Sequence, residues 1–311
     1  MGEQQCAETL MSAGRGWGIA AAWNAHRCTD GRLMAMEHQL MGFSQMEIRA
    51  DLAPGLQEGL RRALEQGLIE IGVIRALGGG GVSEGAEERR AWVRQARVAL
   101  EMAEAWGAGR VILNLGMTSM RASTPELERL AWEGGLHGRS YVKVKLDLVQ
   151  RRLALSATLL ERAREVLDEL LPEAKRRRVK LALETPGCFE EAPTMSELQT
   201  LLEHYADTPW LGVWWEMGNV QRLANLGFLD HAEALRAVAP RVMGCAVQDV
   251  SWPGKGQWIP FSQGGVDFAQ LIPLLPPEAL QVWRMDPSQR RARIEAARRQ
   301  WEEQFCAAAA G

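Results

Sequence analysis

The stretch Val179-Lys180-Leu181-Ala182-Leu183-Glu184 is a short apolar run that ends in a carboxylate, and Trp210-Leu211-Gly212-Val213-Trp214-Trp215-Glu216 repeats this pattern further along the chain. Runs of this length and composition are typical of buried strands. Between them, Thr194–Tyr205 has the apolar spacing of a helix and begins with a capping box, Thr194-Met195-Ser196-Glu197. Two buried strands joined by a helix predict a parallel pair with a helical crossover.

The same alternation of strand and helix extends over the whole chain. The predicted strands are 18–23, 45–49, 69–75, 110–115, 179–184, 210–216, 241–247 and 280–285. The predicted helices are 32–41, 56–66, 87–106, 148–171, 194–205, 230–239, one that starts at Asp267 as its N-cap, and 289–305. Eight such units in order favour a closed barrel over an open sheet, so we expect residues 1–311 to form one α/β domain, a (β/α)8 TIM barrel.

Strand parity gives an internal test of the barrel. Side chains alternate between the two faces of a strand, so positions two or four residues before an inward side chain also point inward. If Glu184, Glu216 and Ala246 end their strands inside the barrel, the same rule turns Trp214 inward. It also places small residues inside adjacent strands, at Ala182, Gly212 and Gly244.

Composition excludes several classes of function. The chain has 311 residues, 47% of them hydrophobic, which is enough for one large core, and its net charge of -3 gives no basic surface for nucleic acid or anionic lipid. No apolar run approaches the roughly 18 residues of a membrane span. The first residues lack a secretion signal. The five cysteines are scattered and odd in number, so they predict no disulfide framework: Cys6, Cys28, Cys188, Cys245 and Cys306. We therefore expect a cytoplasmic protein.

The glycine-rich and irregular segments bear on ligand binding. The four glycines Gly78–Gly81 lack the Lys-Ser/Thr of a phosphate-binding loop, and no Gly-x-Gly-x-x-Gly follows the first strand, which disfavours a nucleotide site. The connection 117–147 after the fourth strand is the longest irregular segment. A connection of this length inside a compact domain is typical of a binding loop, so we expect it to be a candidate lid.

Polar side chains at the carboxyl ends of the predicted strands define the candidate site, because barrels of this kind place their chemistry there. Glu184, Glu216 and Arg284 are the candidate catalytic residues. The candidate ligand-binding residues are Asn114, Glu190, Asn219, Gln248, Trp214, Trp252 and Trp258. Aromatic faces at a pocket mouth suit the C–H faces of a sugar, although the tryptophans could equally fill the core.

At this point the chain resembles the xylose-isomerase-like sugar phosphate isomerase/epimerase superfamily over most of its length. Leu181–Glu184 looks like the family's strand-five metal glutamate, and the spacing of Glu184 and Phe189-Glu190 is similar to that of ketose 3-epimerases, in which the second glutamate contacts substrate. Four further segments are similar to family segments in their order and spacing: Leu211–Asn219, Met243–Asp249, Gly264–Phe268 and Gln281–Pro287.

The departures from the family pattern concern the metal. The family holds a divalent ion with Glu, Asp, His and Glu, and the matching positions here are Glu184, Glu216, Ala246 and Arg284, with Asn219 in place of a supporting His. Alanine and arginine cannot ligate a metal. We therefore expect no metal, with a divalent ion such as Mn as the alternative if the pairing is wrong. Our hypothesis is that Arg284 bridges the two glutamates in place of the ion.

Three functions follow from these observations. The first is an isomerase or epimerase that acts on a carbohydrate-like small molecule, with Glu184 and Glu216 exchanging a proton and Arg284 holding the developing oxyanion. The second is a non-catalytic barrel that binds a ligand or a partner. A phosphodiesterase or abasic-site nuclease is disfavoured, because it needs a His-rich site and the chain has only five His. We expect no nucleic-acid or membrane partner and leave a homo-oligomer open.

Overall fold

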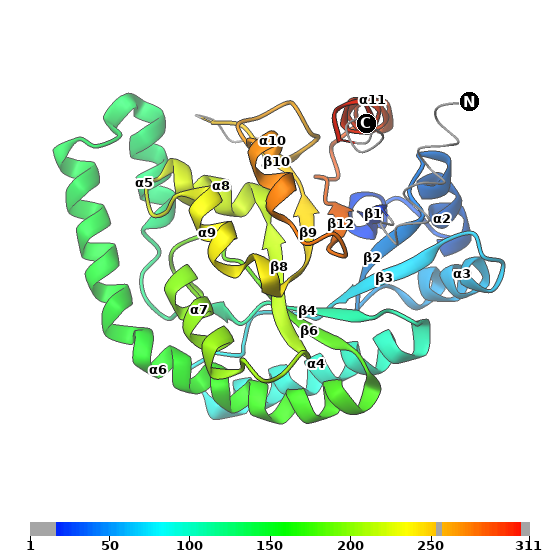
Figure 1. Cartoon of the computed structure of the whole chain (residues 1–311), viewed down its shortest axis with the longest axis horizontal. Coiled ribbons are helices and arrows are strands. Elements are labelled where there is room, and N and C mark those ends of the chain that lie inside the picture. Colours follow the sequence, from blue (N-terminus) through cyan, green and yellow to red (C-terminus); the bar gives the residue numbers. More distant parts are fainter. Residues whose placement is uncertain (1–16, 253–256, 306–311) are drawn as a thin grey trace.

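The structure is a computed structural model that describes residues 17–252 and 257–305 (Figure 1). Within these residues, eight parallel strands close into a barrel in the order β1-β12-β9-β8-β6-β4-β3-β2. The strands are β1 (Trp17–Ala20), β2 (Gln45–Arg49), β3 (Glu70–Arg75), β4 (Arg110–Leu113), β6 (Lys180–Glu184), β8 (Leu211–Glu216), β9 (Val242–Val247) and β12 (Leu280–Trp283). The predicted single-domain (β/α)8 barrel is confirmed.

Helices cover the outside of the barrel. The α-helices are α2 (Gly31–Leu40), α3 (Pro54–Glu65), α4 (Ala86–Trp106), α5 (Thr124–Leu130), α6 (Arg139–Arg177), α7 (Met195–His204), α8 (Met217–Asn225), α9 (His231–Val238), α10 (Phe268–Leu271) and α11 (Arg291–Phe305). Short helical turns are η1 (Ala21–Trp23), η2 (Ala131–Gly135), η3 (Ala239–Arg241) and η4 (Ile272–Leu274). Two small antiparallel pairs lie in the loops: β5 (Gly116–Met117) with β7 (Glu191–Ala192), and β10 (Asp249–Val250) with β11 (Gln257–Ile259).

Helix ends follow the local sequence signals. The capping box at Thr194 is present, since its side chain accepts from the N–H of Glu197 and the Glu197 side chain accepts from the N–H of Thr194. Asp267 caps α10, as predicted, by accepting from the N–H of Gln270. Gly107 ends α4 in the left-handed conformation that favours glycine.

Helix α6 differs from the prediction at both ends. The expected helix over 148–171 in fact runs from Arg139 to Arg177, with Pro172 inside it. Its first turns are held because Tyr141 is buried and its hydroxyl donates to the carbonyl of Leu226. A proline inside a helix removes one N–H, but Leu170 and Ala174 on either side of it are fully buried, and this packing holds the helix past it. The irregular connection after β4 is correspondingly shorter than 117–147, and α5 and η2 lie within it.

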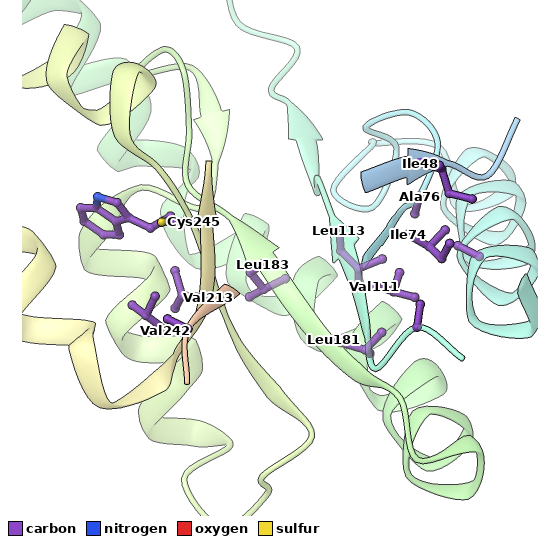
Figure 2. Packing of buried hydrophobic residues seen from close by; sticks show 14 of the residues in the cluster. Ile48, Ile74, Ala76, Val111, Leu113, Leu181, Leu183, Val213, Val242 and Cys245 are labelled. Carbon is purple, nitrogen blue, oxygen red and sulfur yellow. The ribbon is translucent and has the colours of Figure 1, made fainter. Parts of the chain in front are cut away.

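Strand parity is confirmed by two separate apolar layers. The barrel interior contains Trp214, with Ala20, Val73, Ile112, Ala182, Leu280 and Val282. The alternate positions pack outward against the helices, and Figure 2 shows this for Leu181, Leu183 and Val213, among others. A Cβ on Gly244 would lie 2.4 Å from the Trp214 ring, so the glycine makes the room that the indole fills.

Two further predictions concern membrane-spanning helices and the cysteines. No helix among the described residues is long and apolar enough to span a membrane. Cys28, Cys188 and Cys245 are free thiols. Cys6 and Cys306 lie outside the described residues.

Candidate functional site

The carboxyl ends of the strands bring two predicted glutamates together. Glu184 ends β6 and Glu216 ends β8, and these strands are direct neighbours in the barrel. Glu216 is fully buried and Glu184 is 8% exposed. Two acidic side chains held this close and away from water need positive charge to remain ionised.

Arg284, which follows β12, supplies part of that charge. Its Nη1 lies 3.2 Å from Oε1 of Glu184 and 3.0 Å from Oε1 of Glu216, so one nitrogen donates to both carboxylates. The guanidinium carbon lies 4.8 Å from the centre of the Trp258 ring, a cation–π contact. Arg284 therefore bridges the pair in the geometry that the sequence predicts.

Arg75 at the end of β3 supplies the second positive charge, and sequence reasoning missed it. Its Nη1 lies 2.7 Å from Oε1 of Glu184, and its Nη2 lies 2.9 Å from Oε1 of Glu216. Its Nε donates to Oε1 of Glu47, on β2, over 2.6 Å. All three nitrogens of one buried guanidinium thus contact different carboxylates. Burial opposes this charge, but Glu184, Glu47 and Glu216 raise the pKa of Arg75 well above its usual value.

Two neutral side chains complete the network. The amide of Asn114 donates to Oε2 of Glu184 over 3.3 Å, and the amide of Gln248 donates to Oε2 of Glu216 over 2.7 Å. Thr185 accepts from the backbone N–H of Glu216 over 2.9 Å and so ties β6 to the end of β8. The predicted residues Asn114 and Gln248 therefore lie at the carboxylate pair, on opposite sides of it.

The pKa values of the two glutamates are shifted in opposite directions. Burial raises the pKa of Glu216 to about 7, and the charge of Glu184 adds to this while Arg284 and Arg75 oppose it. Burial would also raise the pKa of Glu184, but Arg75 and Arg284 outweigh it and hold that pKa at about 2. Since the two sites interact, the proton belongs to the pair as a whole.

A count of charges gives the same result independently. Three carboxylates, Glu47, Glu184 and Glu216, face two guanidiniums, Arg75 and Arg284. A buried net charge is costly, and uptake of one proton removes it. The network is therefore neutral when the pair holds one proton, which leaves one ionised and one protonated carboxyl.

The residues present do not fit a divalent cation. Ala246 lies beside Glu216 in the strand register, and a methyl group cannot ligate. The Oε1 atoms of Glu184 and Glu216 are both bound by guanidinium nitrogens. Among the residues that the structure describes, no group of three or more His, Cys, Asp or Glu side chains could hold a metal.

Glu190 is not brought to the carboxylate pair. Its side chain is fully buried and accepts from the backbone N–H groups of Ser123 and Thr124 and from the hydroxyl of Thr124. It therefore holds the start of α5, where a negative charge is favourable. The expected substrate contact rested on the spacing between Glu184 and Glu190 in the sequence. That spacing does not show which way the Glu190 side chain turns, and it faces the helical layer.

Among the described residues, no side-chain hydrogen bond joins three other predicted binding residues to the carboxylates of the pair. Trp214 is fully buried and fills the barrel interior. Trp252 packs in an apolar cluster with Phe189 and Phe228, outside the barrel. Asn219 lies in the first turn of α8 beside the loop glycine Gly187. The Trp258 ring, by contrast, lies against the guanidinium of Arg284.

Two cavities are lined by residues outside the network. One, of about 260 Å³, lies where β1 and β2 end and is lined by His26, Arg49 and Asp51 among others. The other, of about 350 Å³, lies between α6, α7 and the loop after β6. Neither is lined by Glu184 or Glu216.

Fold and site together define an α/β barrel with a buried network of carboxylates and guanidiniums at the carboxyl ends of its strands. The sequence matches the family model described as xylose isomerase-like TIM barrel over residues 38–286. The chain belongs to this family. None of the curated proteins matches it significantly in sequence.

Solved structures agree on the fold. A D-tagatose 3-epimerase-like protein is 16% identical with a TM-score of 0.67, and the match covers 95% of this chain and 100% of that one. An L-ribulose 3-epimerase is 14% identical with a TM-score of 0.68, over 94% and 95% of the two chains. The 3-keto-D-glucoside 4-epimerase YcjR from E. coli is 13% identical with a TM-score of 0.69, over 93% and 99%. At these identities the likeness shows the fold alone.

Proposed function

We propose that the protein is an isomerase or epimerase of a carbohydrate-like small molecule that works without a divalent metal. The observation that carries the proposal is the buried network of three carboxylates and two guanidiniums, which is neutral with one proton on the pair of Glu184 and Glu216. An acid–base reaction next to a carbonyl needs one carboxylate to take a proton and one carboxyl to give one. The opposite pKa shifts of the two glutamates supply both.

The chemistry balances within the network. The ionised carboxylate of the pair takes the proton from the carbon next to the carbonyl, and the C–H electrons form the C=C bond of an enediolate. The carbonyl oxygen gains the negative charge, which Arg284 stabilises from the exposed side of the network, where its side chain is 17% exposed. Return of a proton from the second carboxyl to the opposite face of the same carbon restores the carbonyl and completes an epimerisation. Return to the former carbonyl carbon completes an isomerisation when the hydroxyl proton passes from the neighbouring oxygen to the former carbonyl oxygen, so that the new C=O forms on the neighbouring carbon.

The burial of Glu216 favours a second candidate. A fully buried carboxyl whose oxygens accept from Arg75, Arg284 and Gln248 is difficult for a substrate to reach. The second candidate is therefore a barrel that binds a ligand at its mouth without converting it. The family resemblances bear equally on both candidates, because fold does not fix function.

Solvent exchange tests the proposal. Chelator-treated protein is incubated with a panel of free ketoses and aldoses in D2O, and deuterium at the carbon next to the carbonyl is followed by NMR. We expect incorporation with at least one sugar, and a rate about a hundredfold lower in Glu184→Gln, because a positioned base contributes at least that much. Glu58→Gln, at an exposed position on α3, is the control and should not slow the exchange.

Two outcomes decide between the candidates. Saturable binding of a sugar, measured by calorimetry, with no deuterium incorporation would favour the non-catalytic barrel. Incorporation that needs added Mn, and that Glu184→Gln leaves unchanged, would refute the metal-free network.

A further inference from the structure

The first half of helix α6 carries a row of exposed apolar side chains. Val142 is 43% exposed, Leu146 is 56% exposed and Leu153 is 66% exposed. Val149 lies between the last two and is partly exposed. The steps of four, three and four residues place all four side chains on one face of the helix, which is the spacing of a coiled-coil seam. Apolar side chains in such a row normally face a partner. We call this row the α6 stripe.

The inner face of α6 and its second half already have partners within the chain. Leu148 and Leu159 on the inner face are buried. Helix α4 lies along the second half, where its Arg89 forms an ion pair with Glu165. The first half runs along the outer edge of the molecule (Figure 1). The α6 stripe therefore lies on the part of the helix that is open to a second molecule.

The apolar surface continues beyond the helix. Leu153 also lines the cavity of about 350 Å³, together with Phe189, Phe228 and Leu229. The rings of Phe189 and Phe228 lie 4.3 Å apart at an interplanar angle of 13°. An exposed apolar surface that extends from a helix into a neighbouring hollow is typical of a site of protein–protein contact.

Charges at the two ends of the stripe indicate which partner fits. Lys143 lies at its N-terminal end and Glu161 lies beyond its C-terminal end, and both are exposed. Neither has an ion-pair partner among the residues that the structure describes. They are separated by about five turns of helix, so they lie on the same flank of the stripe. When two copies of one helix pack antiparallel about a two-fold axis, the same flanks adjoin. Lys143 of each copy then faces Glu161 of the other, whereas a parallel pair would place like charges at the same level.

We propose that the α6 stripe binds a second copy of this chain, so that two α6 helices pack antiparallel across a two-fold axis. Near the axis, Leu153 of one copy lies against Val149 of the other. At each end, Val142 lies against Leu160, which is partly exposed and continues the row. The same surface is used twice, as closed two-fold symmetry requires. The contact does not depend on the proposed reaction.

Sedimentation equilibrium of the full chain tests the proposal. We expect a monomer–dimer equilibrium with a Kd in about the micromolar range. Leu146→Glu combined with Leu153→Glu places like charges in the seam, and we expect this variant to raise Kd at least about a hundredfold. Leu33→Glu combined with Leu40→Glu is the matched control on α2, where these leucines are 60% and 70% exposed, and it should leave Kd unchanged. All four positions are exposed, so both variants should melt like the wild type by circular dichroism.

Charge reversal tests the direction of the pair. Lys143→Glu and Glu161→Lys each set like charges against each other at both ends of the antiparallel contact, so we expect each to raise Kd about fivefold or more. The two substitutions combined bring opposite charges together again and should restore the wild-type Kd. A parallel dimer would show no such restoration.

Three results of these experiments would overturn the proposal: a chain that stays monomeric at about 100 µM, a dimer that the two leucine substitutions on α6 leave intact, and charge reversals that do not compensate each other. Co-sedimentation of a monomeric chain with vesicles of phosphatidylglycerol and phosphatidylcholine in equal parts would also overturn it, because the stripe would then bind a lipid surface.

Discussion

Two buried arginines, Arg75 at the barrel mouth and Arg152 on α6, differ in the number of carboxylates that each one contacts. Arg152 forms a two-pronged pair with one carboxylate, Glu197, in the helical layer. Arg75 contacts three carboxylates and shares two of them with Arg284. Both arginines are less than one tenth exposed, so burial does not distinguish the two sites.

The number of charges distinguishes them. The pair of Arg152 and Glu197 has one cation and one anion, so its net charge is zero without an added proton. Three anions against two cations become neutral only by holding a proton, and burial raises the pKa of Glu216 accordingly. An odd carboxylate in a buried network, more than burial itself, therefore marks the place where proton chemistry can occur.

Removal of Arg75 should have the largest effect. Arg75→Met leaves three buried carboxylates against one guanidinium, and we expect a loss of about 3–5 kcal/mol in the free energy of unfolding. The loss should be smaller at roughly pH 5 than at roughly pH 8, because protonation of the buried carboxylates at the lower pH relieves the excess negative charge. Urea denaturation at both pH values measures it. Arg49→Met, at an exposed pair with Asp51, is the control and should cost less than about 1 kcal/mol. Equal losses in the two variants would contradict the network.

Breaking the one-to-one pair should cost slightly less and behave differently with pH. Glu197→Gln keeps the capping box but leaves Arg152 as an unpaired buried cation, so we expect a loss of about 3 kcal/mol. An arginine remains charged across this range, so the loss should be the same at about pH 5 and about pH 8. The same denaturation series measures it. A loss that varies with pH as in Arg75→Met would remove the distinction between the two sites.

Overpacking of the barrel interior below the network should have the third largest effect on stability. In Gly244→Ala, the added Cβ would lie 2.4 Å from the Trp214 ring and 2.8 Å from the carbonyl of Leu280. Overpacking of this kind costs about 1–3 kcal/mol. Gly109→Ala meets nothing within 4 Å and should leave the thermal midpoint unchanged. If both variants melt like the wild type, Trp214 does not fill the interior as described.

The proton on the carboxylate pair gives the smallest effect. Folding raises the pKa of Glu216 to about 7 from an ordinary value of 4.5, so the folded state binds this proton more tightly than the unfolded state. The stability from this group is present below the ordinary value and is lost as pH rises through about 7. As pH rises from roughly 6 to roughly 8, we expect the stability of Glu216→Gln relative to the wild type to increase by about 1–2 kcal/mol. A constant difference between the two proteins across this range would show that the pair holds no proton.

Strand ends were predictable from sequence because they depend on local pattern. Glu184, Glu216 and Arg284 each close an apolar run, and parallel strands in one barrel bring their carboxyl ends to one face. Arg75 also closes a predicted strand. It was missed because the candidate set took polar side chains from other strand ends, such as Asn114 and Gln248, and none from the strand 69–75. A search for every charged residue at a strand end would have found it.

Residues in loops could not be placed in the same way. Glu190 and Trp252 lie near predicted strand ends in the sequence, yet they face the helical layer. A loop has no fixed alternation of side chains, so nothing in the sequence shows which way such a residue turns. The same applies to the start of α6, where the tertiary contact of Tyr141 with Leu226 holds turns that local pattern left irregular.

The sequence by itself determined the order of strands and helices, the closed barrel and the inward parity of Trp214, because hydrophobic period and strand alternation are local properties of the chain. Only the tertiary structure decided the composition of the charged network. Whether Arg75, Glu47, Glu184, Glu216 and Arg284 meet depends on barrel closure, which brings β2, β3, β6, β8 and the end of β12 to one point. The balance of charge at that point, and with it the retained proton, is a property of the assembled site and of no single stretch of sequence.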